Sequence, residues 1–404
     1  MLISRPLYIK QLLPFIDKPQ VKILTGIRRS GKSTILKLLK EELLRRDIQS
    51  EQILIVNFES FLFSDFKTAK SLYQYVSDKI EKGRRFYLLL DEIQEVVQWE
   101  MAVNSLLVDF DVDIYLTGSN SHLLSSELST FLAGRYVQIP VFTLSYNEYL
   151  NFSKEQISGN KSDDNLFRRY LRMGGFPVIH TQNYDTDSAY KVVRDIYSSV
   201  ILRDTVQRHN IRDIELLERV VRFAFDNIGN TFSGKNVADY FKNQQRKVDI
   251  NTIYNYLTAL ESAFVLYRVS RYDIKGKEIL KTMEKFYVGD LALIYATMGY
   301  RDRMIGGILE NIVFLELKRR GYNVYIGKLA AKEVDFIAEK AGYKIYVQVA
   351  YKLDRNETVE REFQALLAIQ DQYPKYVVSM DDFWQDDIQG IQHLHISDFL
   401  KAAI

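Results

Sequence analysis

Four residues near the N-terminus have the types and the spacing needed to hold a phosphate chain. The segment Gly26-Ile-Arg-Arg-Ser-Gly31-Lys32-Ser33 fits the pattern G-x-x-x-x-G-K-[ST] of a Walker A loop. Glycines let backbone N–H groups close around phosphates, and the lysine can pair with the β- and γ-phosphates. The serine hydroxyl is a suitable ligand for Mg²⁺. The segment therefore predicts a nucleotide site with Mg²⁺.

The surroundings of this loop agree with that interpretation. An apolar strand-like run precedes it at 21–26, and an amphipathic helical run follows at 33–46. The N-terminus of such a helix adds a favourable dipole for anions. We expect the whole loop to contact nucleotide, through Gly26, Arg28, Arg29, Ser30, Gly31, Lys32, Ser33 and Thr34.

Two adjacent acids end the apolar run Leu88-Leu89-Leu90-Asp91-Glu92 later in the chain. Asp91 is expected to hold the magnesium shell, and Glu92 to act as the general base that activates the attacking water. Acids at a strand end can also be an ordinary solvated terminus. The preceding loop favours the catalytic interpretation, in which Lys32 also stabilises the transferred phosphoryl group.

Two further segments offer polar groups to this site. The run 112–119 ends in Thr117, Gly118 and Ser119, and Asn120 follows it. These polar groups could contact the γ-phosphate or orient water, and an ordinary turn is the alternative. Arg135 is a candidate arginine finger, acting within the chain or from a neighbouring copy. A role from a neighbour would require a homo-oligomer, and a plain surface arginine is the alternative.

The base is predicted to be adenine, so the expected ligand is ATP. The stretch 160–163 reads N-K-S-D, like the guanine-binding pattern, but it lies in a polar region with no apolar strand before it. The glycine expected three places after Asp91 in GTPases is replaced by Gln94. Glu92 also occupies the position where additional-strand ATPases carry a glutamate.

The composition excludes several classes of function. Lys and Arg total 54 against 52 Asp and Glu, so a net charge of +2 gives no overall attraction to nucleic acid or membrane. The chain has no cysteine, which excludes disulfides, thiolate metal sites and cysteine nucleophiles and fits a reducing compartment. No signal-peptide pattern and no run of about 18 apolar residues occurs, so we expect a cytoplasmic address and no membrane partner.

The elements that must position these residues are those of an α/β fold, a P-loop NTPase parallel sheet with helices on both faces. Strand-like runs alternate with helical patterns over the first third, which predicts this domain at 1–150. A helical linker or lid region is expected at 151–215, next to a polar, linker-like stretch at 149–165. Residues 216–300 have the outline of a winged helix-turn-helix, two helices followed by a strand, a Gly-containing turn and a strand.

The chain resembles prokaryotic AAA-like ATPases that carry a C-terminal domain of unknown function. The resemblance implies an ATPase core, a winged-helix region and a restriction-endonuclease-like αβββαβ domain at 301–404. It places the nucleotide residues on Gly31, Lys32, Ser33, Asp91 and Glu92, with Asn57 or Glu59 as a further addition. The matching stretches are ILTGIRRSGKSTIL, VNFES, LLLDEIQEV, YLTGSNSHLL, LAGRY, LRMGGFP, most of the winged-helix segment and EVDFIAEKAGYKIYVQVAY.

The C-terminal region departs from the nuclease pattern at the residues that carry the chemistry. Endonucleases of this fold need an acid on the first helix, an Asp at a strand end and a Glu-x-Lys on the next strand. Glu310 and Asp335 match the first two positions, but the third reads Gln348-Val-Ala350. We therefore expect a domain without nuclease activity that serves binding or docking. Lys344 and Lys352 share a strand face with Gln348, so a catalytic lysine at a displaced position stays an alternative.

Two classes of partner remain for such an ATPase. The expected recognition helix at 249–261 has no Lys or Arg, so contact with DNA or other nucleic acid would depend on basic residues around it. The alternative is a regulatory nucleotide switch whose C-terminal domains bind a protein partner, and a metal-dependent nuclease is a weaker third possibility. The basic residues in question are Lys242, Arg246, Lys247, Arg268, Arg271, Lys275, Lys277 and Lys281.

Overall fold

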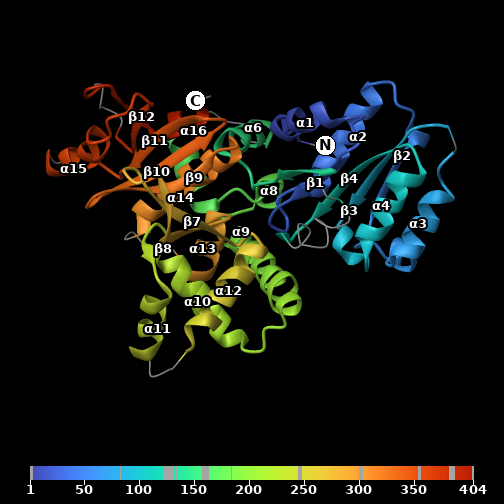
Figure 1. The fold of residues 1–404 in the computed structure, drawn as a ribbon, viewed down its shortest axis with the longest axis horizontal. Coiled ribbons are helices and arrows are strands. Elements are labelled where there is room, and N and C mark those ends of the chain that lie inside the picture. Colours follow the sequence, from blue (N-terminus) through green and yellow to red (C-terminus); the bar gives the residue numbers. More distant parts are fainter. Residues whose placement is uncertain are drawn as a thin grey trace. The chain divides into compact units, whose positions relative to one another are not determined.

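The computed structural model contains two compact units. It describes residues 3–81, 83–121, 132, 134–156, 163–182, 184–243, 248–299, 304–353, 356–381 and 387–402. The first unit comprises Met1–Thr143 with Ser262–Phe264, and the second comprises Leu144–Glu261 with Val265–Ile404. Figure 1 labels many of the elements of both units.

A parallel sheet forms the centre of the first unit. Among the described residues its order is β2-β3-β4-β1-β5, and every neighbouring pair runs parallel. The strand β4 lies between β1, which leads into the glycine loop, and β3, which ends in the acids. The strands are β1 (Val21–Thr25), β2 (Ile53–Asn57), β3 (Phe86–Asp91), β4 (Val112–Gly118) and β5 (Tyr136–Pro140).

Helices cover both faces of this sheet, as the sequence predicted. Because successive strand residues point to opposite faces, β3 contributes Leu88 and Leu90 to one apolar cluster and Tyr87 and Leu89 to another. The first cluster packs against α3 and α4, and the second against α1 and α2. These helices are α1 (Pro6–Leu12), α2 (Lys32–Arg45), α3 (Ala69–Ser77) and α4 (Trp99–Asp109), with 3-10 turns at η1 (Leu13–Phe15), η2 (Ser50–Gln52), η3 (Phe61–Phe66) and η4 (Ile93–Glu95).

Helices open the second unit. The polar stretch 149–165, expected to be a linker, begins inside the helix α6, where Tyr149 and Phe152 are buried. Asn151, between these two aromatic residues in the sequence, is exposed. The helices are α6 (Tyr146–Gln156), α7 (Asp163–Met173), α8 (Pro177–Thr181), α9 (Thr186–Ser199), the π-helix η6 (Val200–Gln207) and α10 (Ile214–Asp226).

A mixed sheet in the second unit joins two segments that the sequence suggested were separate. Within the described part of the chain its order is β13-β12-β11-β10-β9-β7-β8-β6. The strands β7 and β9 pair in parallel, so the sheet continues from the hairpin β7–β8 into the last hundred residues. The strands are β6 (Thr231–Phe232), β7 (Leu266–Asp273), β8 (Glu278–Val288), β9 (Asn323–Leu329), β10 (Lys332–Lys340), β11 (Tyr343–Val349), β12 (Lys375–Ser379) and β13 (Ile391–His395).

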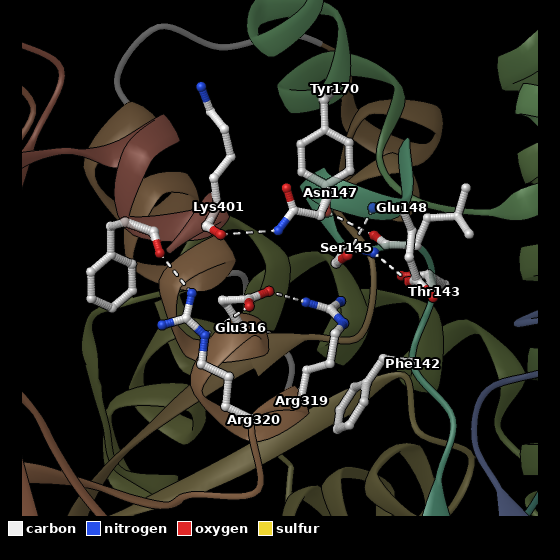
Figure 2. A network of polar contacts seen from close by, with 12 residues as sticks. Phe142, Thr143, Ser145, Asn147, Glu148, Tyr170, Glu316, Arg319, Arg320 and Lys401 are labelled. Atoms are coloured by element: carbon white, nitrogen blue, oxygen red, sulfur yellow. Dashed lines mark hydrogen bonds and ion pairs between the residues drawn. The ribbon is translucent and has the colours of Figure 1, made fainter. Parts of the chain in front are cut away.

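The remaining helices of this unit pack around the sheet and tie its early and late parts together. In Figure 2, Asn147 on α6 donates to the backbone oxygen of Lys401, and Glu316 accepts from Arg319 and Arg320. The helices are α11 (Gly234–Asn243), α12 (Ile250–Ser262), α13 (Leu291–Met298), α14 (Ile305–Arg319), α15 (Asn356–Leu367) and α16 (Ile396–Lys401). In the described ranges, no helix combines the length and the apolarity that crossing a membrane requires.

Candidate nucleotide site

The loop between β1 and α2 has a backbone that requires its glycines. Gly26 has φ of 151° and Gly31 has φ of 99°, values that side-chain-bearing residues rarely adopt. A Cβ atom on Gly26 would lie 2.1 Å from the backbone oxygen of Val141. Arg29 is left-handed with φ of 66°. Gly31 is the N-cap of α2, which begins at Lys32, so the amino end of this helix opens onto the loop.

Lys32 is buried within the loop that it follows. Its ammonium donates to the backbone oxygens of Gly26 at 2.8 Å and Ile27 at 3.1 Å. The hydroxyl oxygen of Ser30 is buried and has no hydrogen-bond partner in the described part of the chain. A buried hydroxyl without a partner is costly, and a phosphate oxygen is the kind of acceptor that would satisfy it. The loop therefore fits the phosphate chain of a nucleotide.

Arg5 forms hydrogen bonds to this loop that were not predicted from the sequence. Its buried guanidinium donates to the backbone oxygen of Ser30 at 2.7 Å and to that of Phe142 at 3.0 Å. Another loop residue, Arg28, forms an ion pair of 2.7 Å with Glu59, just beyond β2. The two arginines thus connect the loop to the N-terminal segment and to the second strand.

The first acid is held from both neighbouring strands. The Thr117 hydroxyl on β4 donates to Oδ1 of Asp91 at 2.5 Å, and the Asn57 amide on β2 donates to Oδ2 at 3.1 Å. Thr117 also accepts from the backbone N–H of Glu92 at 2.9 Å. Asp91 is buried and has an oriented carboxylate, which suits a Mg²⁺ shell. Thr117 thereby positions both acids, a role different from the phosphate contact that the sequence suggested.

Glu92 follows in an unusual backbone conformation. Its φ of 56° is left-handed, which for such a residue costs on the order of 1 kcal/mol and is typical of functional sites. Burial raises the pKa of Glu92, while the positive charges of Lys32 and Arg28 act to lower it. Both of these positive charges belong to the phosphate loop and the start of α2. The side-chain amide of Gln94 donates to Oε2 of Glu92.

The remaining residues predicted to contact nucleotide lie at opposite ends of the sheet. Asn120 and Ser119, just beyond the carboxyl end of β4, are buried. Arg135 is exposed and precedes β5, and its backbone oxygen accepts from the N–H of Val21 at the start of β1. It therefore lies at the amino end of the sheet, whereas Lys32 follows the carboxyl end. A finger role within the same chain does not fit this position, and a role in a neighbouring copy stays a prediction.

The acids of the second unit meet around a lysine that the sequence analysis did not single out. The ammonium of Lys285 on β8 lies 2.8 Å from Glu333, 3.3 Å from Glu310 and 3.9 Å from Asp335. Burial acts to lower the pKa of Lys285, but these acids more than offset it, so the pKa is raised. Tyr287 donates to Glu310 at 2.9 Å. A protein cation thus lies between the two expected metal-binding acids.

Gln348, at the third position of the nuclease pattern, forms its side-chain hydrogen bonds with other residues of the protein. Gln348 donates to Glu362 at 2.8 Å and accepts from the backbone N–H of Asp335 at 3.2 Å. Lys344 lies over the rings of Tyr272 and Tyr373. In the described ranges no group of three or more His, Asp or Glu residues is arranged to hold a metal. A pocket of about 940 Å³ adjoins these residues and is lined by both acidic and basic side chains.

The basic residues near the hairpin β7–β8 divide into paired and exposed ones. Arg268 forms ion pairs with Glu261 at 2.8 Å and with Glu284 at 3.5 Å. Lys242, Lys275 and Lys277 are exposed, whereas Arg246, Lys247 and the side chain of Lys281 lie outside the described residues. α12 follows the sequence expectation and carries neither Lys nor Arg.

A parallel sheet with β4 between β1 and β3, a glycine-lysine loop after β1 and two acids after β3 defines a P-loop NTPase of the additional-strand type. Residues 18–150 match the family model of an AAA domain, and residues 164–303 match that of a domain of unknown function.

An uncharacterised protein of Haemophilus influenzae is 38% identical over 400 residues, which are 99% of this chain and 98% of that protein. Another, from Methanocaldococcus jannaschii, is 30% identical over 362 residues, 86% of this chain and 78% of its own length. The chain belongs to the family of these relatives, an AAA-like ATPase family with a C-terminal domain of unknown function. Among solved structures, a Walker-type ATPase of Pyrococcus abyssi aligns with a TM-score of 0.48 at 15% identity, covering 73% of this chain and 95% of that one.

Proposed function

We propose that this protein binds ATP with Mg²⁺ and hydrolyses it. The observation that carries the proposal is the meeting of three strand ends: the loop with Lys32 after β1, the oriented Asp91 and Glu92 after β3, and Thr117 on β4 between them. The unsatisfied hydroxyl of Ser30 within the loop supports a phosphate ligand.

Each residue has a role that follows from its surroundings. Lys32 neutralises charge on the β- and γ-phosphates, and its two backbone contacts are exchanged for phosphate oxygens. Ser33 and Asp91 would hold Mg²⁺, which when bound supplies Lewis-acid charge neutralisation to the phosphates. Glu92 accepts a proton from the attacking water, whose oxygen bonds to the γ-phosphorus as the bond to the ADP oxygen breaks.

Two substitutions separate binding from chemistry. Lys32→Ala should weaken binding of a fluorescent ATP analogue strongly, whereas Glu92→Gln should keep binding and lose turnover by about 10²-fold or more, as expected when a general base is removed. Lys37→Ala and Glu41→Gln, at exposed positions of α2, are matched controls that should change neither quantity. Wild-type turnover by the Glu92→Gln protein would refute the assignment of the base.

For the second unit we propose a winged helix followed by a restriction-endonuclease-like fold without nuclease activity. The helices α10, α11 and α12 followed by the hairpin β7–β8 support the first part, and the order α14, β9, β10, β11, α15, β12 supports the second. The ion pairs of Lys285 support the loss of metal chemistry. Plasmid cleavage that depends on Mg²⁺ or Mn²⁺ and is lost in Asp335→Ala would overturn this proposal.

We further propose that ATP turnover is coupled to DNA or other nucleic acid. The exposed Lys275 and Lys277 in the turn of the hairpin, with Lys242 at the end of α11, support the proposal. The alternative, a nucleotide switch with a protein partner, is favoured by the ion pairs that occupy Arg268. Stimulation of turnover by DNA that fades steeply with salt and is reduced in Lys275→Ala/Lys277→Ala supports the first, and no stimulation at any salt concentration refutes it.

A further inference from the structure

Gln94 has a hydrogen-bonding arrangement that the roles above do not explain. It lies in the short turn η4, directly after the two acids, and its side chain is half-buried. Its amide nitrogen donates to Oε2 of Glu92. An ionised carboxylate can only accept hydrogen bonds, so this contact fixes which end of the amide faces Glu92.

The other end of the amide is different. Oε1 of Gln94 is buried and makes no hydrogen bond to any residue that the structure describes. A buried acceptor left unsatisfied costs about 1–3 kcal/mol, and such groups in folded proteins usually have a function or a ligand. Burial of the oxygen beside the proposed general base points to a ligand that binds at that base.

We propose that Gln94 positions the water that attacks the γ-phosphate, with its Oε1 and the carboxylate of Glu92 accepting the two hydrogens of that water. A water held by two acceptors has its lone pair directed away from both, which orients it for in-line attack. One proton passes to Glu92, the water oxygen forms the new bond to phosphorus, and the bond from phosphorus to the leaving ADP oxygen breaks. The hydrogen bond from Gln94 to Glu92 fixes the angle between the two acceptors.

This inference rests on the proposed ATPase function and makes a separate claim about one side chain. If Gln94 only fills space, a side chain of similar length without polar atoms should replace it. Gln94→Met removes both the N–H donor and the oxygen acceptor while keeping the length of the side chain. Gln94→Ala removes the side chain as well.

The experiment compares turnover and nucleotide affinity in these two variants and in Gln74→Ala. Gln74 is an apt control because its amide also donates to an acid, Asp78 at 2.7 Å, but at an exposed position of α3 in the same unit. We expect kcat to fall by about 10- to 100-fold in Gln94→Met and Gln94→Ala, as for loss of an orienting contact. The Kd for a non-hydrolysable ATP analogue should stay within about 2-fold, and Gln74→Ala should match the wild type.

Several results would overturn the inference. Turnover at the wild-type rate in Gln94→Met assigns Gln94 to packing, and a raised kcat assigns it to restraining Glu92. A weakened Kd with unchanged kcat assigns it to nucleotide binding. If the wild type and Gln74→Ala bind ATP but do not hydrolyse it, the proposed function itself fails. A failure of the inference alone leaves both of these proteins active, so the two failures are distinguishable.

Discussion

Replacing Lys285 with Met should destabilise the second unit strongly, because it would leave three acids without their shared cation. The Lys285 side chain is 4% exposed, and those of Asp335 and Glu310 are 10% and 16% exposed. Removing one partner of a buried ion pair costs about 3–5 kcal/mol. The elements that should loosen together are β8, α14 and β10, which supply the lysine, Glu310 and Asp335.

Hydrogen exchange followed by mass spectrometry measures this locally, which matters because the two units need not unfold together. Amides of β8, α14 and β10 that exchange through unfolding of the unit should exchange about 10²- to 10⁴-fold faster in Lys285→Met, the equivalent of that free energy. Lys332→Met, an exposed position on β10 at the edge of the same pocket, should change exchange by less than about 3-fold. Equal exchange in Lys285→Met and the wild type would refute the assignment of the lysine as the neutralising cation.

Three further outcomes follow from the contacts of Thr117 and Gly26 and from the burial of His180 in α8. Burial lowers the pKa of His180 to about 4, so below pH 6.5 the unfolded chain binds a proton that the folded chain does not. The free energy of unfolding should therefore fall by up to about 3 kcal/mol from pH 7 to pH 4, and by less in His180→Gln. An equal fall in both proteins would contradict this. Thr117→Val should raise the Mg²⁺ concentration that gives half-maximal turnover about 10-fold or more, and Thr117→Ser should not, because of the two only serine keeps both hydrogen bonds. Equal Mg²⁺ concentrations for the two variants would contradict the positioning role. Gly26→Ala should reduce binding of a fluorescent ATP analogue about 10-fold or more, because its Cβ would lie 2.1 Å from a backbone oxygen; unchanged affinity would contradict the loop geometry.

The first unit was accessible from sequence because its signals are local. The Walker A pattern and the apolar run before Asp91 lie within continuous segments, and their periodicity predicted the parallel sheet and its two covered faces. The contacts of Arg5 were not accessible, because they join residues 25 and 137 positions apart through backbone oxygens that any residue type provides. The same applies to Thr117, whose hydroxyl has two uses that depend on which strand lies beside it.

The second unit was less accessible because its decisive feature is a pairing between distant strands. Nothing in the composition of β7 or β9 indicates that they run side by side, yet this pairing joins the hairpin to the last hundred residues in one sheet. The expected division at residue 300 stays a prediction, although the sheet continues across it. Lys285 is one of two lysines in β8 and follows Glu284, so the sequence offered no distinct signal for it. Its partners could be identified only once β8, α14 and β10 were placed together.

The continuous sheet and the lysine cluster have a joint consequence for what the second unit can do. The hairpin supplies the ammonium, and the segment after residue 300 supplies the carboxylates, so each part satisfies a charge of the other. A nuclease-like centre that needed Mg²⁺ at Glu310 and Asp335 would have to expel an ammonium that is itself anchored in the sheet. Separating β8 from α14 would leave unpaired charges on both sides, which opposes motion between them. The ion pairs therefore oppose the opening of a metal site, in agreement with the proposal that this unit contributes recognition of a partner and not cleavage.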